Sequence, residues 1–111
     1  MRYEWDERKR KVNLHKHGFD FLDAPRVFRG GATLTVADDR QDYGEERFIT
    51  FGLLRDNVVA IAHTEHPKTI RIISMRKATS HEEKSYFTKI DYRLEADSED
   101  EGSRHRPFGP T

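Results

Sequence analysis

Two neighbouring segments carry the side chains best suited to chemistry. Residues 58–65 (VVAIAHTE) include His63, and residues 69–76 (TIRIISMR) include Arg71 and Arg76. An imidazole can exchange a proton near neutral pH. A guanidinium stays charged and can bind two oxygens of one phosphate. These residue types near the ends of predicted strands indicate a site for a phosphate-bearing substrate.

Strand periodicity predicts which of these side chains share a face. Side chains alternate along a strand, so a register that pairs His63 with Arg71 places both on one side of the sheet. A three-residue turn at 55–57 then brings Arg47 near Glu65, at the same end of that face. A slip of one residue separates this cluster. Arg76 falls on the opposite face, and the sequence does not decide which face the helices cover. We predict four catalytic candidates, with His63 as the acid–base group: Arg47, His63, Arg71 and Arg76.

Each candidate also has a structural interpretation. A histidine at the end of a strand is often solvated or hydrogen-bonded and takes no part in catalysis. The competing ion pairs are Arg47 with Glu45 or Glu46, and Arg76 with Glu83. The histidines at 15 and 17 lie two apart on a predicted helix and point in different directions, so we predict no metal site and no cofactor.

Composition indicates one small domain with a polar tail. The chain has 111 residues, of which 36% are charged and 34% hydrophobic. Residues 95–111 are almost devoid of apolar side chains and rich in acidic ones, so we predict a domain over 1–94 and a disordered acidic tail over 95–111. Before residue 95 there are 18 basic and 15 acidic residues. This mild excess of positive charge is compatible with a polyanionic partner, but by itself it favours a well-solvated surface of mixed charge.

The environment expected from the composition is the cytoplasm. Cysteine is absent, which excludes disulfides and thiolate metal sites. The N-terminus contains no apolar segment typical of a secretion signal, and no apolar run approaches the length needed to cross a membrane.

The order of predicted elements indicates an α+β fold. Asp6 can cap a helix that ends at Gly18, and Asp20 can cap a short helix over 21–28 that contains Pro25. Residues 2–5 form a leading strand or an extended arm. Four strands follow, at 32–39, 47–54, 58–65 and 69–76, and a last helix begins at Thr79 or Ser80. Short connections make the strands antiparallel neighbours. We therefore predict two N-terminal helices and a C-terminal helix packed with a four-stranded antiparallel sheet.

Several motifs, taken in order, resemble the BrnT toxins. The most specific are KHG at 16–18, GEER at 44–47 and RIISMRKA at 71–78, and the likeness extends over about residues 3–90. BrnT proteins are the ribonuclease halves of BrnT–BrnA type II toxin–antitoxin pairs. The resemblance implies a RelE-like fold and metal-independent RNA cleavage that inhibits translation. It also implies neutralisation by a BrnA-like ribbon–helix–helix antitoxin, with operator DNA bound only through the complex, as a dimer or a heterotetramer.

An RNA substrate would give the basic residues a role in binding the phosphates. Cleavage without a metal uses the 2′-hydroxyl of the RNA as the nucleophile, and it needs an acid, a base and cations around the phosphate. The basic helix is either a solvated surface or a track for the RNA backbone. The side chains that we expect to bind RNA are Lys9, Lys11, Lys16 and Lys77. Two other hypotheses are a binding module without catalysis and a regulator that binds DNA only through a complex.

Overall fold

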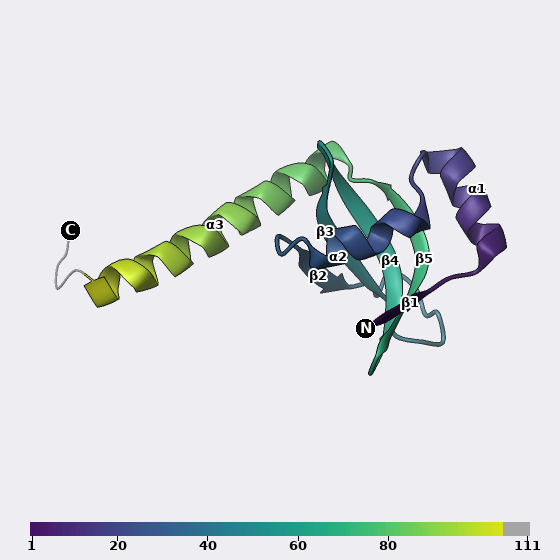
Figure 1. Ribbon diagram of the computed structural model, residues 1–111, viewed down its shortest axis with the longest axis horizontal. Helices are drawn as coiled ribbons and strands as arrows, with labels where there is room; N and C mark the ends of the chain where they lie inside the picture. Colours follow the sequence, from purple (N-terminus) through teal and green to yellow (C-terminus); the bar gives the residue numbers. More distant parts are fainter. Residues whose placement is uncertain (106–111) are drawn as a thin grey trace.

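The computed structural model describes the backbone of residues 1–105 and the side chains of residues 1–94. Its centre is a five-stranded mixed sheet with the order β1-β5-β4-β3-β2 (Figure 1). The strands are β1 (Arg2–Glu4), β2 (Leu34–Ala37), β3 (Phe48–Leu54), β4 (Asn57–His66) and β5 (Thr69–Lys77). The helices are α1 (Glu7–His17), the 3₁₀ helix η1 (Phe21–Asp23), α2 (Ala24–Arg29) and α3 (Ser80–His105).

The α+β class is confirmed, and the four predicted strands are antiparallel neighbours, but the sheet has a fifth strand and is mixed. Strand β1 adds to the edge of β5 in parallel, with Arg2 opposite Thr69. Three residues are too few for periodicity to establish a pairing partner. Side chains hold this strand in place: the ring of Tyr3 lies 5.7 Å from that of Phe28.

The N-terminal helices begin and end for local reasons that the sequence shows. The Asp6 carboxylate accepts a hydrogen bond from the backbone N–H of Lys9, and Gly18 takes a left-handed conformation with φ of 78° at the end of α1. The predicted second helix divides into η1 and α2. Pro25 occupies the first turn of α2, where a missing N–H costs no hydrogen bond.

Helices cover the two faces of the sheet unequally. On the face that we call the α2 face, Phe21, Val27 and Ile61 are fully buried in the main core. On the other, the α3 face, Tyr86 and Ile90 of α3 pack near Val58 and form a smaller core. Figure 1 shows α2 lying across the sheet, whereas α3 contacts it only with its first turns and then extends away. Among the described residues, the end of the α3 face that carries Arg71 therefore has no helix over it.

Two local irregularities set the register of the central strands. The β3–β4 turn has two residues, not the predicted three: Leu54 pairs with Asn57, and Arg55 adopts a positive φ of 56°. In the β4–β5 pair, a bulge between Ala62 and His63 displaces the register by one residue. Side chains beyond the bulge therefore pair differently from the prediction.

The predicted division of the chain at residue 94 stays a prediction. Helix α3 continues through His105, and the side chains from 95 onward and the backbone of 106–111 lie outside the described residues. Within the described part of the chain, no helix combines the length and the apolar character required to cross a membrane.

Candidate functional site

Two arginines, one on β5 and one just before β3, meet at one carboxylate on the α3 face. Nη2 of Arg71, on β5, donates a hydrogen bond of 2.7 Å to Oε2 of Glu45. Nε of Arg47, which precedes β3, donates to the same oxygen at 3.2 Å. Thr64 pairs with Arg71, and Phe48 pairs with His63, so Arg47, one residue before β3, lies on the same face as Thr64 and Arg71. We call Arg47, Glu45, Thr64 and Arg71 the arginine row.

The electrostatics of the arginine row keep Glu45 ionised. Partial burial alone would raise the pKa of Glu45, but the hydrogen bond from Arg47 and the charge of Arg71 outweigh burial and lower it. The hydroxyl of Thr64 and Nε of Arg71 are buried and form no hydrogen bond within the described part of the chain. The row thus has two cations and hydrogen-bonding capacity that its neighbours do not use.

A second ion pair supports the row from the β2–β3 loop. Asp38 is buried, and hydrogen bonds from Arg40 lower its pKa to about 2. The hydroxyl of Tyr43 also donates to Asp38, at 3.2 Å. The ring of Tyr43 lies 4.1 Å from the guanidinium carbon of Arg47, a cation–π contact. Asp38 and Tyr43 therefore hold Arg47 in place.

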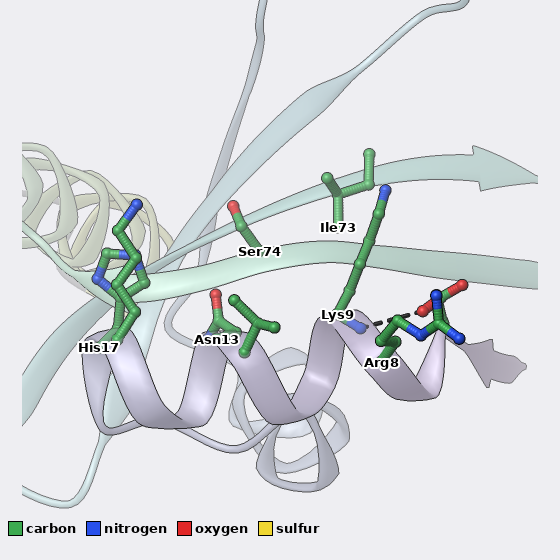
Figure 2. A pocket seen from close by; sticks show the side chains of 9 residues that line it. Arg8, Lys9, Asn13, His17, Ile73 and Ser74 are labelled. Atoms are coloured by element: carbon green, nitrogen blue, oxygen red, sulfur yellow. Dashed lines mark hydrogen bonds between the residues drawn. The ribbon is translucent and has the colours of Figure 1, made fainter.

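A groove of about 460 Å³ separates α1 from β5. Its rim is basic, and its floor includes two aliphatic side chains. Figure 2 shows Lys9, Asn13 and His17 projecting from α1 toward Ile73 and Ser74 of β5. The lining residues are Asp6, Arg8, Lys9, Val12, Asn13, Lys16, His17, Ile73 and Ser74.

Asn13 fixes the distance between α1 and β5 across this groove. Its Nδ2 donates to the carbonyl oxygens of Met75 at 2.8 Å and of Phe19 at 3.1 Å. Its Oδ1 accepts a hydrogen bond of 3.1 Å from the backbone N–H of Met75. One buried amide thus satisfies both backbone groups of a residue on the sheet.

The family model of the ribonuclease toxin BrnT, of type II toxin–antitoxin systems, matches residues 5–82. The chain belongs to the BrnT family. No curated protein matches it significantly. The matched residues include the arginine row and every residue that lines the groove. Membership of this family implies a ribonuclease toxin that acts with an antitoxin partner.

In this BrnT chain, the predicted cluster of Arg47, His63, Glu65 and Arg71 on one face does not form. The register displaced by the turn and the bulge pairs His63 with Ile72, on the α2 face, while Arg47 and Arg71 lie on the α3 face. His63 is fully buried: its ring packs 5.1 Å from that of Phe28, and its Nε2 lies 2.7 Å from the hydroxyl of Thr50. The sheet therefore separates His63 from the arginine row.

Arg76 also lies apart from the row, at the other end of β5. It forms a two-point ion pair with Glu82 in the first turn of α3, at 2.8 and 3.1 Å. Hydrogen bonds from Arg76 lower the pKa of Glu82 to about 2. The predicted pair of Arg76 with Glu83 is wrong, because the helix residue that pairs with Arg76 is Glu82. The alternative pair of Arg47 with Glu45 is confirmed.

The four predicted RNA-binding lysines separate into two groups. Lys9 and Lys16 line the groove, whereas Lys11 and Lys77 are exposed elsewhere. Sequence reasoning missed Asn13 and Tyr43. A polar residue on the helix face between Lys9 and Lys16 could have indicated Asn13, but no local pattern indicated Tyr43. Among the side chains that the structure describes, no three histidine, aspartate or glutamate residues are grouped as metal ligands.

The burial of His63 predicts a pH dependence of stability. Burial lowers the pKa of His63, and the charge of Glu65 offsets only part of this effect. The unfolded chain, with a histidine pKa of about 6.5, takes up this proton first. The contribution of neutral His63 to the free energy of unfolding is therefore complete above about pH 6.5. It is lost as the pH falls toward the lower pKa of the folded state. We expect the free energy of unfolding to fall between pH 7 and pH 5.

Urea denaturation at several pH values measures this effect, with His63→Gln as the comparison. The variant should show a shallower decrease from pH 7 to pH 5. Asp38 and Glu82 act at lower pH, because their contributions are lost only as the pH falls from about 4 toward about 2. Equal slopes for the two proteins would contradict the assignment.

Proposed function

We propose that this BrnT-family protein is an endoribonuclease that cleaves RNA without a metal ion, through attack of the 2′-hydroxyl on the neighbouring phosphodiester. The observation that carries the proposal is the arginine row. One guanidinium group comes from β5 and the other from the residue before β3, and both lie within hydrogen-bonding distance of one oxygen of Glu45. A substrate phosphate placed there would meet two positive charges and the single negative charge of Glu45, a net charge of +1.

The chemistry requires charge stabilisation above all. Attack by the 2′-oxygen adds negative charge to the oxygens on phosphorus, and Arg47 and Arg71 offset it. Glu45 is the carboxylate closest to both arginines and is ionised, the form that can accept the proton of the 2′-hydroxyl. As the bond between the 2′-oxygen and phosphorus forms, the bond to the 5′-oxygen breaks and that oxygen takes a proton from solvent water. Glu45 returns its proton to solvent, and the products are a 2′,3′-cyclic phosphate and a 5′-hydroxyl.

This proposal changes the roles given to two predicted residues. The burial of His63 favours a structural role over acid–base catalysis, because its ring is enclosed by Phe28 and Phe48. Arg76 anchors the start of α3 through Glu82. The proposed catalytic residues are therefore Arg47 and Arg71, which stabilise charge, and Glu45, which accepts the proton.

The biological consequences in this proposal follow from the family. Cleavage of cellular RNA inhibits translation in the cytoplasm. A cognate BrnA-like ribbon–helix–helix antitoxin neutralises the enzyme and binds operator DNA, with the toxin joining only through that complex. The family description, which names a ribonuclease toxin of a type II system, supports this assignment.

The products of the purified protein test the mechanism. Single-stranded RNA incubated with the protein and excess EDTA should yield 2′,3′-cyclic phosphate and 5′-hydroxyl ends. A substrate with a single 2′-deoxy nucleotide at the mapped cleavage position should resist cleavage there. Products with 5′-phosphate ends, or activity that returns only with added Mg²⁺, would exclude attack by the 2′-hydroxyl. Binding of RNA without cleavage would favour the non-catalytic module.

A further inference from the structure

The groove between α1 and β5 combines an apolar floor with a cationic rim. Val12 is an apolar residue of α1, yet 61% of it is exposed, and Ile73 lines the groove from β5. Arg8, Lys9 and Lys16 line the same groove, and none of them forms an ion pair within the described part of the chain. Asp6, the one acidic residue in the lining, caps α1 through the backbone of Lys9.

The bulge in β4–β5 pairing gives the groove its floor. The register passes from Ala62 opposite Ser74 to His63 opposite Ile72, so Ile73 has no partner on β4. As a result, Ile73 and Ser74 both line the groove, although they are neighbours in the chain. Figure 2 shows both side chains on the strand above α1.

The polar groups of the groove differ in their availability. Asn13 uses its amide nitrogen and oxygen in three hydrogen bonds to the backbone of Phe19 and Met75. Ser74 and His17 form no side-chain hydrogen bond with the described residues. Their hydroxyl and imidazole groups can therefore contact the edge of a ligand.

We infer that this groove binds one nucleotide of the RNA strand and is the site that selects the base. The base lies against Val12 and Ile73, Lys9 and Lys16 bind the adjoining phosphates, and Ser74 and His17 contact the base edge. A volume of about 460 Å³ suits a ligand of this size. An apolar surface enclosed by cations complements a nucleotide, which joins an apolar ring face to anionic phosphates.

The inference rests on the proposed function, because it places the groove next to the arginine row. Arg71 and Ser74 are three residues apart on β5, about 10 Å along the strand. That separation allows neighbouring nucleotides of one RNA strand to occupy both places. Specificity would then come from the groove and charge stabilisation from the row.

The test uses 2′-O-methyl oligonucleotides, which lack the nucleophile and cannot be cleaved by the proposed route. The series spans a mapped cleavage site, with one abasic nucleotide at each position in turn. For the wild-type protein, one abasic position should raise the Kd about tenfold. In Val12→Ser the intact oligonucleotide should bind more weakly, and the penalty at that position should nearly disappear.

Leu14→Ser is the matched control, because Leu14 is an exposed apolar residue of the same helix outside the groove. It should retain the wild-type Kd and the wild-type abasic penalty. If the abasic nucleotide raises the Kd equally in the wild-type protein and in Val12→Ser while RNA is still cleaved, the inference about the groove is wrong and the proposed function stands. A wild-type protein that neither binds nor cleaves RNA would overturn the proposed function as well.

Discussion

Replacing Arg71 with alanine is expected to lower the rate of RNA cleavage by about 10²–10³-fold. In the proposed function, Arg71 offsets charge that develops on the phosphate oxygens, and its loss removes one of two fixed donors. Stability should change by less than about 1 kcal/mol, because the pair with Glu45 is at the surface and 41% of the Arg71 side chain is exposed. Cleavage rates and urea denaturation curves, measured on the same preparations, separate the two effects.

Two further variants make the Arg71 measurement specific. Arg71→Lys retains the charge but loses the planar fork, so its activity should lie between those of the alanine variant and the wild-type protein. Arg29→Ala removes an exposed cation from α2 and should leave cleavage unchanged. If Arg71→Ala cleaves RNA at the wild-type rate while remaining folded, the arginine row is not the catalytic centre.

Most elements of the fold were predictable because their signals are local. Asp6 and Gly18 limit α1 as expected, since a capping side chain and a left-handed glycine act within a few residues. Strands β2 to β5 follow the apolar pattern of the sequence. The pairing of β1 with β5 was not predictable, because it depends on packing between segments that are distant in the sequence.

The candidate site was predicted only in part, because two single-residue features determine which face each side chain occupies. The sequence RDN is compatible with turns of two or three residues, and the two-residue turn at Arg55 reverses the parity of β3 relative to β4. The bulge beside His63 displaces β5 by one more residue. The turn moves Arg47 to the other face relative to His63, and the bulge does the same to Arg71. The two arginines therefore still meet, but His63 lies on the opposite face.

Replacing Asn13 with alanine is expected to have the largest effect on stability. Asn13 is buried, and its side chain bonds both the N–H and the carbonyl oxygen of Met75. The variant leaves two buried backbone groups without partners, at a cost of about 1–3 kcal/mol each. We expect a loss of about 2–4 kcal/mol and a decrease in Tm of roughly 10 °C or more.

The comparison with His15→Ala distinguishes the lost hydrogen bonds from a general effect on α1. His15 is exposed on the same helix, so its replacement should leave the Tm nearly unchanged. Because Asn13 also holds α1 at the groove, Asn13→Ala should weaken RNA binding even well below its Tm. If the Asn13 variant unfolds at the wild-type temperature, the amide does not join α1 to β5 in solution. That result would also mean that Asn13 does not hold the two sides of the groove together.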